Sequence, residues 1–398
     1  MSHSKLRLLS LIIWLVLSAA CPHQQGEEKI EWNCLLTYRF GEALILKGKI
    51  QIQNPPQEVS LVLESNSQTV VESLSLDGQG NFEYQDNFQQ LSLRPFERVE
   101  YWLEGVLQDG TPFTTPKREF LYEDNRFPWK TRSQPPFRVH WRQGDLQFAQ
   151  TALNVARDAQ LAIKELFPIE GNLPIDIYIY ATPGELRQVF QNSNPKWVGA
   201  HADPDLGVIL ISVSEGMDQR LQMEQQIPHE MMHIFLYRYH PTAYANLPAW
   251  LKEGLATTVE FYPNPDYYTL LETARQNQSL LSLPGLCQNF PSEAAQAYVA
   301  YAQSAAIVQY LMDQYGIEKI RQLIDAYGEQ LDCEAGFYRT YGFSLAQLEG
   351  EWQKARFGEA NSSRVLANLA PWGILLVCVL FLPLILSWRL LSQSSQKE

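Results

Sequence analysis

Two histidines and a glutamate in one short segment carry the strongest chemical signal in the sequence. The segment 227–236 reads IPHEMMHIFL and contains the pattern His-Glu-x-x-His at His229, Glu230 and His233. On an α-helix, positions i and i+4 lie on one face a turn apart, so the two imidazoles can bind one zinc ion. Glu230 lies about 100° around the helix from His229. From there its carboxylate can take a proton from a water molecule as a general base.

This pattern also has an ordinary interpretation, a pair of core or solvated histidines on a helix that binds no metal. The flanking residues are apolar, which predicts that the segment is buried, and buried imidazoles need partners. Pro228, immediately before His229, lacks a backbone N–H. It therefore predicts a kink or a helix start at that point.

A catalytic zinc site needs a third protein ligand and keeps one position for water. The segment 247–256, LPAWLKEGLA, predicts a second helix with Pro248 near its first turn. Glu253 on this helix is the candidate ligand, and its alternative is a solvated carboxylate beside Lys252. Gly254 and Ala256 are small, so we expect this helix to approach the histidine helix closely.

Together, HEMMH and WLKEGLA resemble the gluzincin metallopeptidases, specifically the bacterial peptidase-MA-like family, over roughly residues 137–357. The resemblance implies that His229, His233 and Glu253 bind Zn²⁺ and that Glu230 activates water for hydrolysis of a protein or peptide substrate. Lys252 departs from the family, in which many members have Asn at this place. The metzincin pattern would need Gly at position 236 and His at position 239, and the sequence has Leu and Tyr there.

Three further segments are secondary candidates. The predicted helix 294–315 contains Tyr298 and Tyr301. In similar zincins a phenol hydrogen-bonds the oxyanion of the tetrahedral intermediate. Tyr301 matches the family pattern better, and the alternative is that both are core aromatics. The apolar segment 207–211 resembles an edge strand that pairs with an extended peptide, or it is a buried central strand. The polar segment 201–205 is either a carboxylate source behind the metal ligands or a plain loop.

The elements around these residues predict two domains. Residues 30–125 contain short runs of β-forming residues separated by turns such as Asn54-Pro55-Pro56, which favours an immunoglobulin- or fibronectin-like sandwich. A polar, Pro-containing stretch at 124–136 reads as a linker. Residues 137–357 then predict an α+β domain, which the resemblance implies is a zincin-like catalytic domain. Its expected elements are strands at 137–141, 173–180 and 207–213, helices at 146–166 and 183–190, and mostly helix after that.

Composition excludes several classes of protein. The 398 residues are 45% hydrophobic, with 31 Lys+Arg against 44 Asp+Glu and a net charge of −13, which argues against a nucleic-acid partner. Five cysteines without a CxxC pair exclude a disulfide scaffold and a thiolate metal cluster. Cys287 and Cys333 fall in one predicted domain and could pair, but their spacing leaves this open. The oligomeric state is not indicated.

Both ends of the chain carry membrane-targeting patterns. Residues 1–21 combine Lys5 and Arg7 with an apolar stretch and small residues, which predicts a signal peptide. Cys21 resembles a lipoprotein acceptor cysteine, with ordinary cleavage or an uncleaved anchor as alternatives. Residues 369–388 contain no charge and predict a single transmembrane helix. We therefore expect a bacterial membrane protein with an extracytoplasmic catalytic domain.

Two rival functions remain open at this stage. A zincin fold could serve as a binding or scaffold protein without turnover, although such a protein has no need of Glu230. A zinc hydrolase of non-peptide bonds would carry the same motifs. The role of the N-terminal strands, the substrate and its cleavage specificity are not indicated by the sequence.

Overall fold

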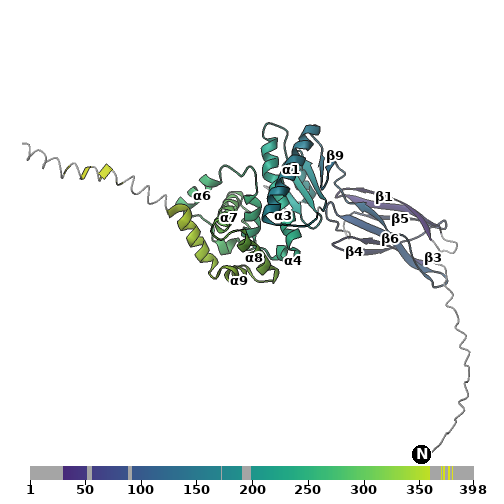
Figure 1. Ribbon diagram of the computed structural model, residues 1–398. Helices are drawn as coiled ribbons and strands as arrows, with labels where there is room; N and C mark the ends of the chain where they lie inside the picture. Colours follow the sequence, from purple (N-terminus) through teal and green to yellow (C-terminus); the bar gives the residue numbers. More distant parts are fainter. Residues whose placement is uncertain are drawn as a thin grey trace, which may run out of the picture. The chain divides into compact units, whose positions relative to one another are not determined.

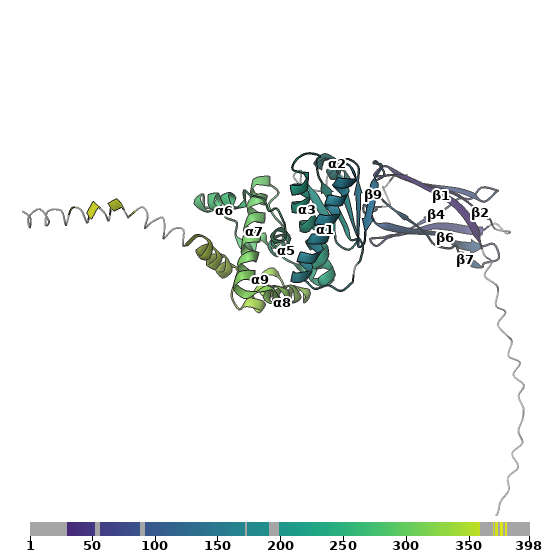
Figure 2. The same ribbon diagram turned by 45° about the horizontal axis from the view of Figure 1, so that its top comes forward.

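The computed structural model describes residues 30–51, 56–87, 92–171, 173–190 and 199–358, with isolated positions between 369 and 379. The described part forms two compact units. Of the described residues, those up to 38, within 43–92 and within 99–120 form the first unit, and those within 39–42, within 93–98 and from 121 onward form the second. Figures 1 and 2 show a strand-rich N-terminal part and a C-terminal part rich in helices.

The first unit consists of two β-sheets. One has the strand order β1-β2-β5, formed by Glu31–Arg39, Ala43–Gln51 and Asn81–Asp86. The other has the order β4-β3-β6-β7, with β8 also on β6; its strands are Thr69–Ser73, Pro56–Glu64, Arg98–Leu107, Pro112–Thr114 and Arg118–Leu121. Trp32 of β1 and Tyr101 of β6 meet edge to face, with ring centroids 5.9 Å apart. This contact joins the two sheets through a shared apolar interior, as a sandwich requires.

The second unit is built on a five-stranded sheet with the order β12-β13-β11-β10-β9. Its strands are β9 (Lys130–Gln134), β10 (Phe137–Trp141), β11 (Ile175–Tyr180), β12 (Ala200–Asp203) and β13 (Val208–Ser212). β10, β11 and β13 run parallel, while β9 and β12 are antiparallel to their neighbours. All five residues of β13 are buried. β13 is therefore an inner strand, so of the two alternatives for segment 207–211 the buried central strand holds, because β12 covers the edge.

Two long helices pack on one face of this sheet. α1 (Leu146–Leu166) agrees with the predicted helix, and Asp145 caps its N-terminus by accepting from the N–H of Phe148 at 2.9 Å. α3 (Gln219–Tyr239) lies beside α1 in both views. The facing side chains of the sheet and of these helices form the apolar core. α3 begins nine residues before Pro228, so the proline lies inside the helix and does not start it.

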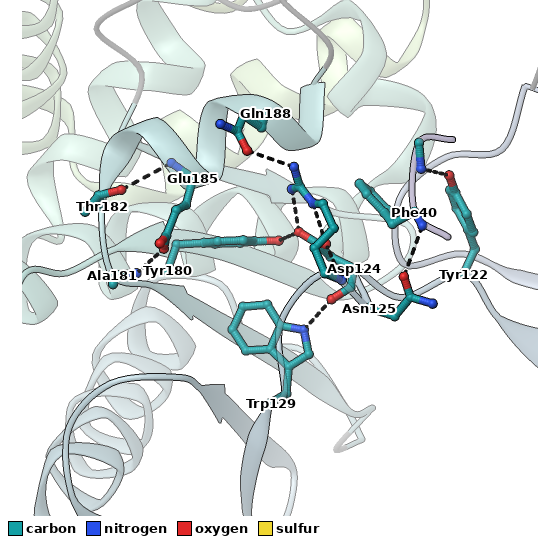
Figure 3. Close-up of polar contacts among 12 residues, drawn as sticks. Phe40, Tyr122, Asp124, Asn125, Trp129, Tyr180, Ala181, Thr182, Glu185 and Gln188 are labelled. Carbon is teal, nitrogen blue, oxygen red and sulfur yellow. Dashed lines mark hydrogen bonds and ion pairs between the residues drawn. The ribbon is translucent and has the colours of Figure 1, made fainter. Parts of the chain in front are cut away.

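The opposite face of the sheet is covered by a polar and aromatic network (Figure 3). Asp124 is fully buried and accepts hydrogen bonds from Arg126 at 2.8 Å and from the hydroxyl of Tyr180 at 3.0 Å. Trp129 donates to the Asp124 carbonyl at 2.8 Å and contacts the Tyr180 ring edge-on. Segment 124–136 is thus not a free linker. It contributes β9 and buried contacts to the second unit, because its aromatic and charged side chains find partners on β11.

The rest of the second unit is helical. α2 (Pro183–Arg187) and the 3₁₀ turn Gln188–Phe190 follow β11, and a helix at 345–358 ends the continuously described chain. Between them lie α4 (Pro241–Asn246), α5 (Ala249–Thr258), α6 (Tyr267–Gln276), the 3₁₀ turn Leu283–Leu286, α7 (Ala294–Tyr315), α8 (Ile317–Gly328) and α9 (Cys333–Tyr341). Cys287 and Cys333 form a disulfide, which answers the pairing left open by spacing.

Among the described residues, no helix has the length and apolar character needed to cross a membrane. The predicted span at 369–388 lies outside the described residues, apart from isolated positions. The predicted signal peptide at 1–21, with Cys21, also lies outside them.

Candidate metal centre

Helix α3 carries the His-Glu-x-x-His pattern into the interior of the second unit. His229 and His233 lie one turn apart, with ring centroids 5.3 Å from each other. Glu230 and His233 are both buried, at 6% and 7% exposure. The apolar residues around the pattern, among them Met231 and Met232, are fully buried in the core and so fix the rotation of the helix.

Glu253 of α5 completes a group of three donor atoms. One carboxylate oxygen of Glu253, Oε2, lies 3.4 Å from Nε2 of His229 and 3.7 Å from Nε2 of His233. Donor atoms from the three residues all lie within 4.8 Å of one another. Two ligands bound tetrahedrally to zinc at ~2.0–2.1 Å are about 3.3 Å apart, so this spacing suits a shared cation. Two neutral histidines and one carboxylate are also a donor set typical of catalytic zinc.

Packing of α5 explains how Glu253 reaches this position. Trp250 is fully buried and meets the ring of Phe337 edge-on, and the N–H of Ala249 donates to the Cys287 carbonyl at 2.9 Å. At Gly254, an added Cβ would lie 2.7 Å from the Ser304 carbonyl oxygen of α7. Gly254 therefore permits close approach to α7, which corrects the expectation that it faces the histidine helix.

The electrostatics of the centre suit a bound cation. Burial raises the pKa of Glu230 to about 8; the charge on His229 opposes this rise, and the charges on Glu253 and Glu260 add to it. For Glu253, burial would raise the pKa, but His233 and a short contact with His229 hold it well below the usual range. Burial lowers the pKa of His233 to about 4. Several carboxylates thus share one buried site, where charges are normally paired or bound to metal.

Tyr301 of α7 lies at the same centre, while Tyr298 does not. The ring centroids of Tyr301 and His229 are 6.0 Å apart. Burial raises the pKa of Tyr301 well above 10, and the charges on Glu253 and Glu230 together with a hydrogen bond to Glu253 raise it further. Tyr298 is 44% exposed. Of the two predicted candidates, only Tyr301 borders the donor atoms.

Glu260 is a residue of this centre that sequence reasoning missed. Its Oε1 lies 2.9 Å from Nδ1 of His229, on the side of the ring away from Glu253, and its side chain is 3% exposed. Glu260 follows the last residue of α5 by two positions and lies seven residues, or about two helical turns, after Glu253. This seven-residue spacing from Glu253 is the sequence feature that could have suggested Glu260 as a residue of the centre.

The carboxylates of segment 201–205 serve another purpose. Asp203, at the end of β12, and Asp205 both form ion pairs with Arg94, the latter at 2.8 Å. Neither belongs to the group of donor atoms. His201 of β12 instead packs edge-on against Phe190, with ring centroids 4.9 Å apart. The carboxylate behind the metal donors is therefore Glu260 and not a residue of this segment.

A comparison with known protein families places the converging donor residues within a peptidase family match. The sequence model of the Peptidase MA superfamily matches residues 155–357, which include both helices of the donor group. The chain belongs to the Peptidase MA superfamily. Membership suggests peptidase activity. No curated protein matches this Peptidase MA chain in sequence.

Two solved structures that resemble the chain each match about a quarter of it. A bromine derivative of BhCBM56 is 14% identical, with a TM-score of 0.18, over 23% of this chain and 90% of its own. A cycloalternan-degrading enzyme from Trueperella pyogenes, in complex with cycloalternan, is 11% identical with a TM-score of 0.18. That match covers 27% of this chain and 16% of the enzyme. At these scores neither likeness bears on function.

Proposed function

We propose that this Peptidase MA chain is a zinc-dependent metallopeptidase of the gluzincin type that hydrolyses peptide bonds. The observation that carries the proposal is the convergence of donor atoms from His229, His233 and Glu253 within 4.8 Å, from two separate helices. Glu230, the general-base candidate, is buried next to one of these histidines. A binding protein with this fold would not need that carboxylate.

His229, His233 and Glu253 would hold the ion. A zinc ion at this site would supply Lewis-acid polarisation of the scissile carbonyl and of a water molecule. Glu230 takes the proton from the attacking water and later delivers it to the leaving amine. The raised pKa of Glu230 reflects burial, and a nearby divalent cation would lower this pKa. Burial keeps bulk water away from the carboxylate, which strengthens its interaction with the transferred proton.

Tyr301 is proposed to donate its phenol hydrogen to the oxyanion that develops during attack. Its position beside His229, with ring centroids 6.0 Å apart, supports this role. The raised pKa means that the phenol remains protonated at neutral pH and can act as a donor. A preorganised donor of this kind contributes several kcal/mol to a transition state in a buried site.

We also propose that the enzyme is a single-pass protein of a bacterial membrane, with its catalytic domain outside the cytoplasm. The apolar segment 369–388 and the signal pattern at 1–21 support this placement. The disulfide between Cys287 and Cys333 is consistent with an oxidising compartment. Protease protection of the catalytic domain in sealed bacterial membranes tests it, and a domain found on the cytoplasmic side would refute it.

The test of function compares matched variants for metal content and cleavage of a peptide library, with and without chelator. Glu230→Gln should keep stoichiometric zinc and slow cleavage by at least ~10²-fold. Glu224→Gln makes the same chemical change on α3, where Glu224 pairs with Arg220, and should cleave like the wild type. His233→Ala should lose zinc.

Three results would count against this function. Unchanged cleavage by Glu230→Gln would remove the mechanism. Retention of full zinc by His233→Ala would reassign the ligands. A wild-type chain that binds zinc but cleaves no peptide would favour the binding protein or a hydrolase of other bonds, which ester and amide substrates would then separate.

A further inference from the structure

Glu260 makes a contact that the proposed hydrolysis does not use. Its Oε1 lies 2.9 Å from Nδ1 of His229, while Nε2 of the same ring faces Oε2 of Glu253 at 3.4 Å. The two ring nitrogens of His229 therefore point toward two different carboxylates. Only the Glu253 side belongs to the group of converging donor atoms.

Metal binding requires a specific form of the imidazole. The coordinating nitrogen must offer a lone pair, so the single proton of the neutral ring has to reside on the other nitrogen. A carboxylate that accepts the N–H from that other nitrogen fixes the tautomer, orients the ring and raises its basicity as a ligand. Glu260 stands in this position relative to His229, with its Oε1 as the acceptor for Nδ1–H.

The surroundings of Glu260 leave it little other purpose. Its side chain is 3% exposed, and within the described part of the chain its second oxygen, Oε2, is buried without a hydrogen-bond partner. Removing the Glu260 carboxylate from water for a contact with the His229 imidazole alone costs desolvation free energy. A cation bound at Nε2 of His229 would offset this cost.

The two histidines of α3 differ in this respect. Among the described residues, Nδ1 of His233 is buried and has no hydrogen-bond partner. The nearby ring of Tyr244, with its centroid 6.4 Å away, approaches His233 edge to face. Of the two histidines, His229 is therefore the one whose Nδ1 contacts a carboxylate, that of Glu260.

We propose that Glu260 is a positioning residue for the metal centre, which holds His229 as the Nδ1–H tautomer and so directs its Nε2 lone pair to the ion. The inference rests on the proposed zinc site but not on peptide hydrolysis. A chain that binds zinc and cleaves nothing would refute the proposed function and leave the affinity comparison below decisive.

The experiment measures zinc dissociation constants of the full chain by competition with a chromophoric chelator. Glu260→Ala should bind zinc about 10–100-fold more weakly than the wild type. Glu260→Gln should lose less, because its amide oxygen still accepts from Nδ1–H. Glu349→Gln is the control, since Glu349 accepts from the N–H of Leu283 at 2.9 Å and belongs to no metal donor group.

Two further readouts separate positioning from a general structural role. In the zinc-loaded wild type, proton NMR should contain a downfield Nδ1–H resonance of His229, which Glu260→Ala abolishes and Glu260→Gln retains. The metal-free variants should melt close to the wild type. Zinc affinity of Glu260→Ala within twofold of the wild type would overturn the proposal. So would equal losses in both variants that track a fall in the metal-free melting temperature.

Discussion

Substitution of Gly254 by alanine should separate α5 from α7 and thereby weaken the metal centre without touching a ligand. The added Cβ would lie 2.6 Å from Cγ2 of Val308 and 2.7 Å from the carbonyl oxygen of Ser304. The Ser304 contact is with backbone, so a change of side-chain rotamer cannot relieve it. Glu253 immediately precedes Gly254 on α5, so any retreat of the helix carries the ligand carboxylate with it.

The size of the effect follows from these distances. Ordinary contact begins at 3.4 Å, so α5 must retreat from the Ser304 oxygen by 3.4 − 2.7 = 0.7 Å. Overpacking of this kind costs about 1–3 kcal/mol, and the better helix propensity of alanine offsets roughly 1 kcal/mol of it. We expect a net loss of about 0–2 kcal/mol in the free energy of unfolding. Because ligand distances tolerate only about 0.2 Å, zinc affinity should fall by roughly tenfold or more.

The assay combines thermal unfolding of the metal-free chain with zinc competition. Gly350→Ala is the matched control, because Gly350 lies in the helix at 345–358 and a Cβ there meets nothing within 4 Å. That control should be stabilised by up to about 1 kcal/mol and should bind zinc like the wild type. If Gly254→Ala is equally stabilised and keeps full zinc affinity, the steric reasoning and the dependence of Glu253 on α7 are both refuted.

Three other predictions test separate parts of the second unit. Replacing Cys287 and Cys333 with serine opens a loop of 46 residues and should lower the free energy of unfolding by about 4 kcal/mol. Urea titration measures this loss, and a loss under about 1 kcal/mol would contradict the prediction. Tyr301→Phe should lower peptidase turnover by about 10²-fold with little change in zinc affinity, and unchanged turnover would make Tyr301 a core aromatic. Burial would raise the pKa of Asp176, but hydrogen bonds from His140 and Arg138 hold it below 3.8 overall. This carboxylate therefore stabilises the fold above about pH 4 and loses that effect as pH falls through its folded pKa, so Asp176→Asn should lose less stability than the wild type between pH 5 and pH 2. Parallel acid curves for the two proteins would contradict this assignment.

Local periodicity determined much of the architecture around the site. The helix at 146–166 and the strand at 137–141 occur as α1 and β10 with the predicted bounds. The spacing of His229 and His233 places them on one face of α3, because backbone hydrogen bonding alone sets 3.6 residues per turn. Where the sequence interpretation failed or stayed open, the question concerned neighbours in space: which strand forms the sheet edge, what segment 124–136 packs against, and which helix Gly254 meets.

The metal centre itself depends on packing between helices. The sequence alone placed two imidazoles and a possible base on one helix, and it offered Glu253 as the third ligand with a solvated carboxylate as the alternative. Only the tertiary structure brought Glu253 Oε2 to within 3.4 and 3.7 Å of the two histidines, and only it revealed Glu260 behind His229. The reason is physical. A helical repeat is set by bonds between residues a few positions apart, whereas the distance between two helices is decided by the side chains that fill the space between them.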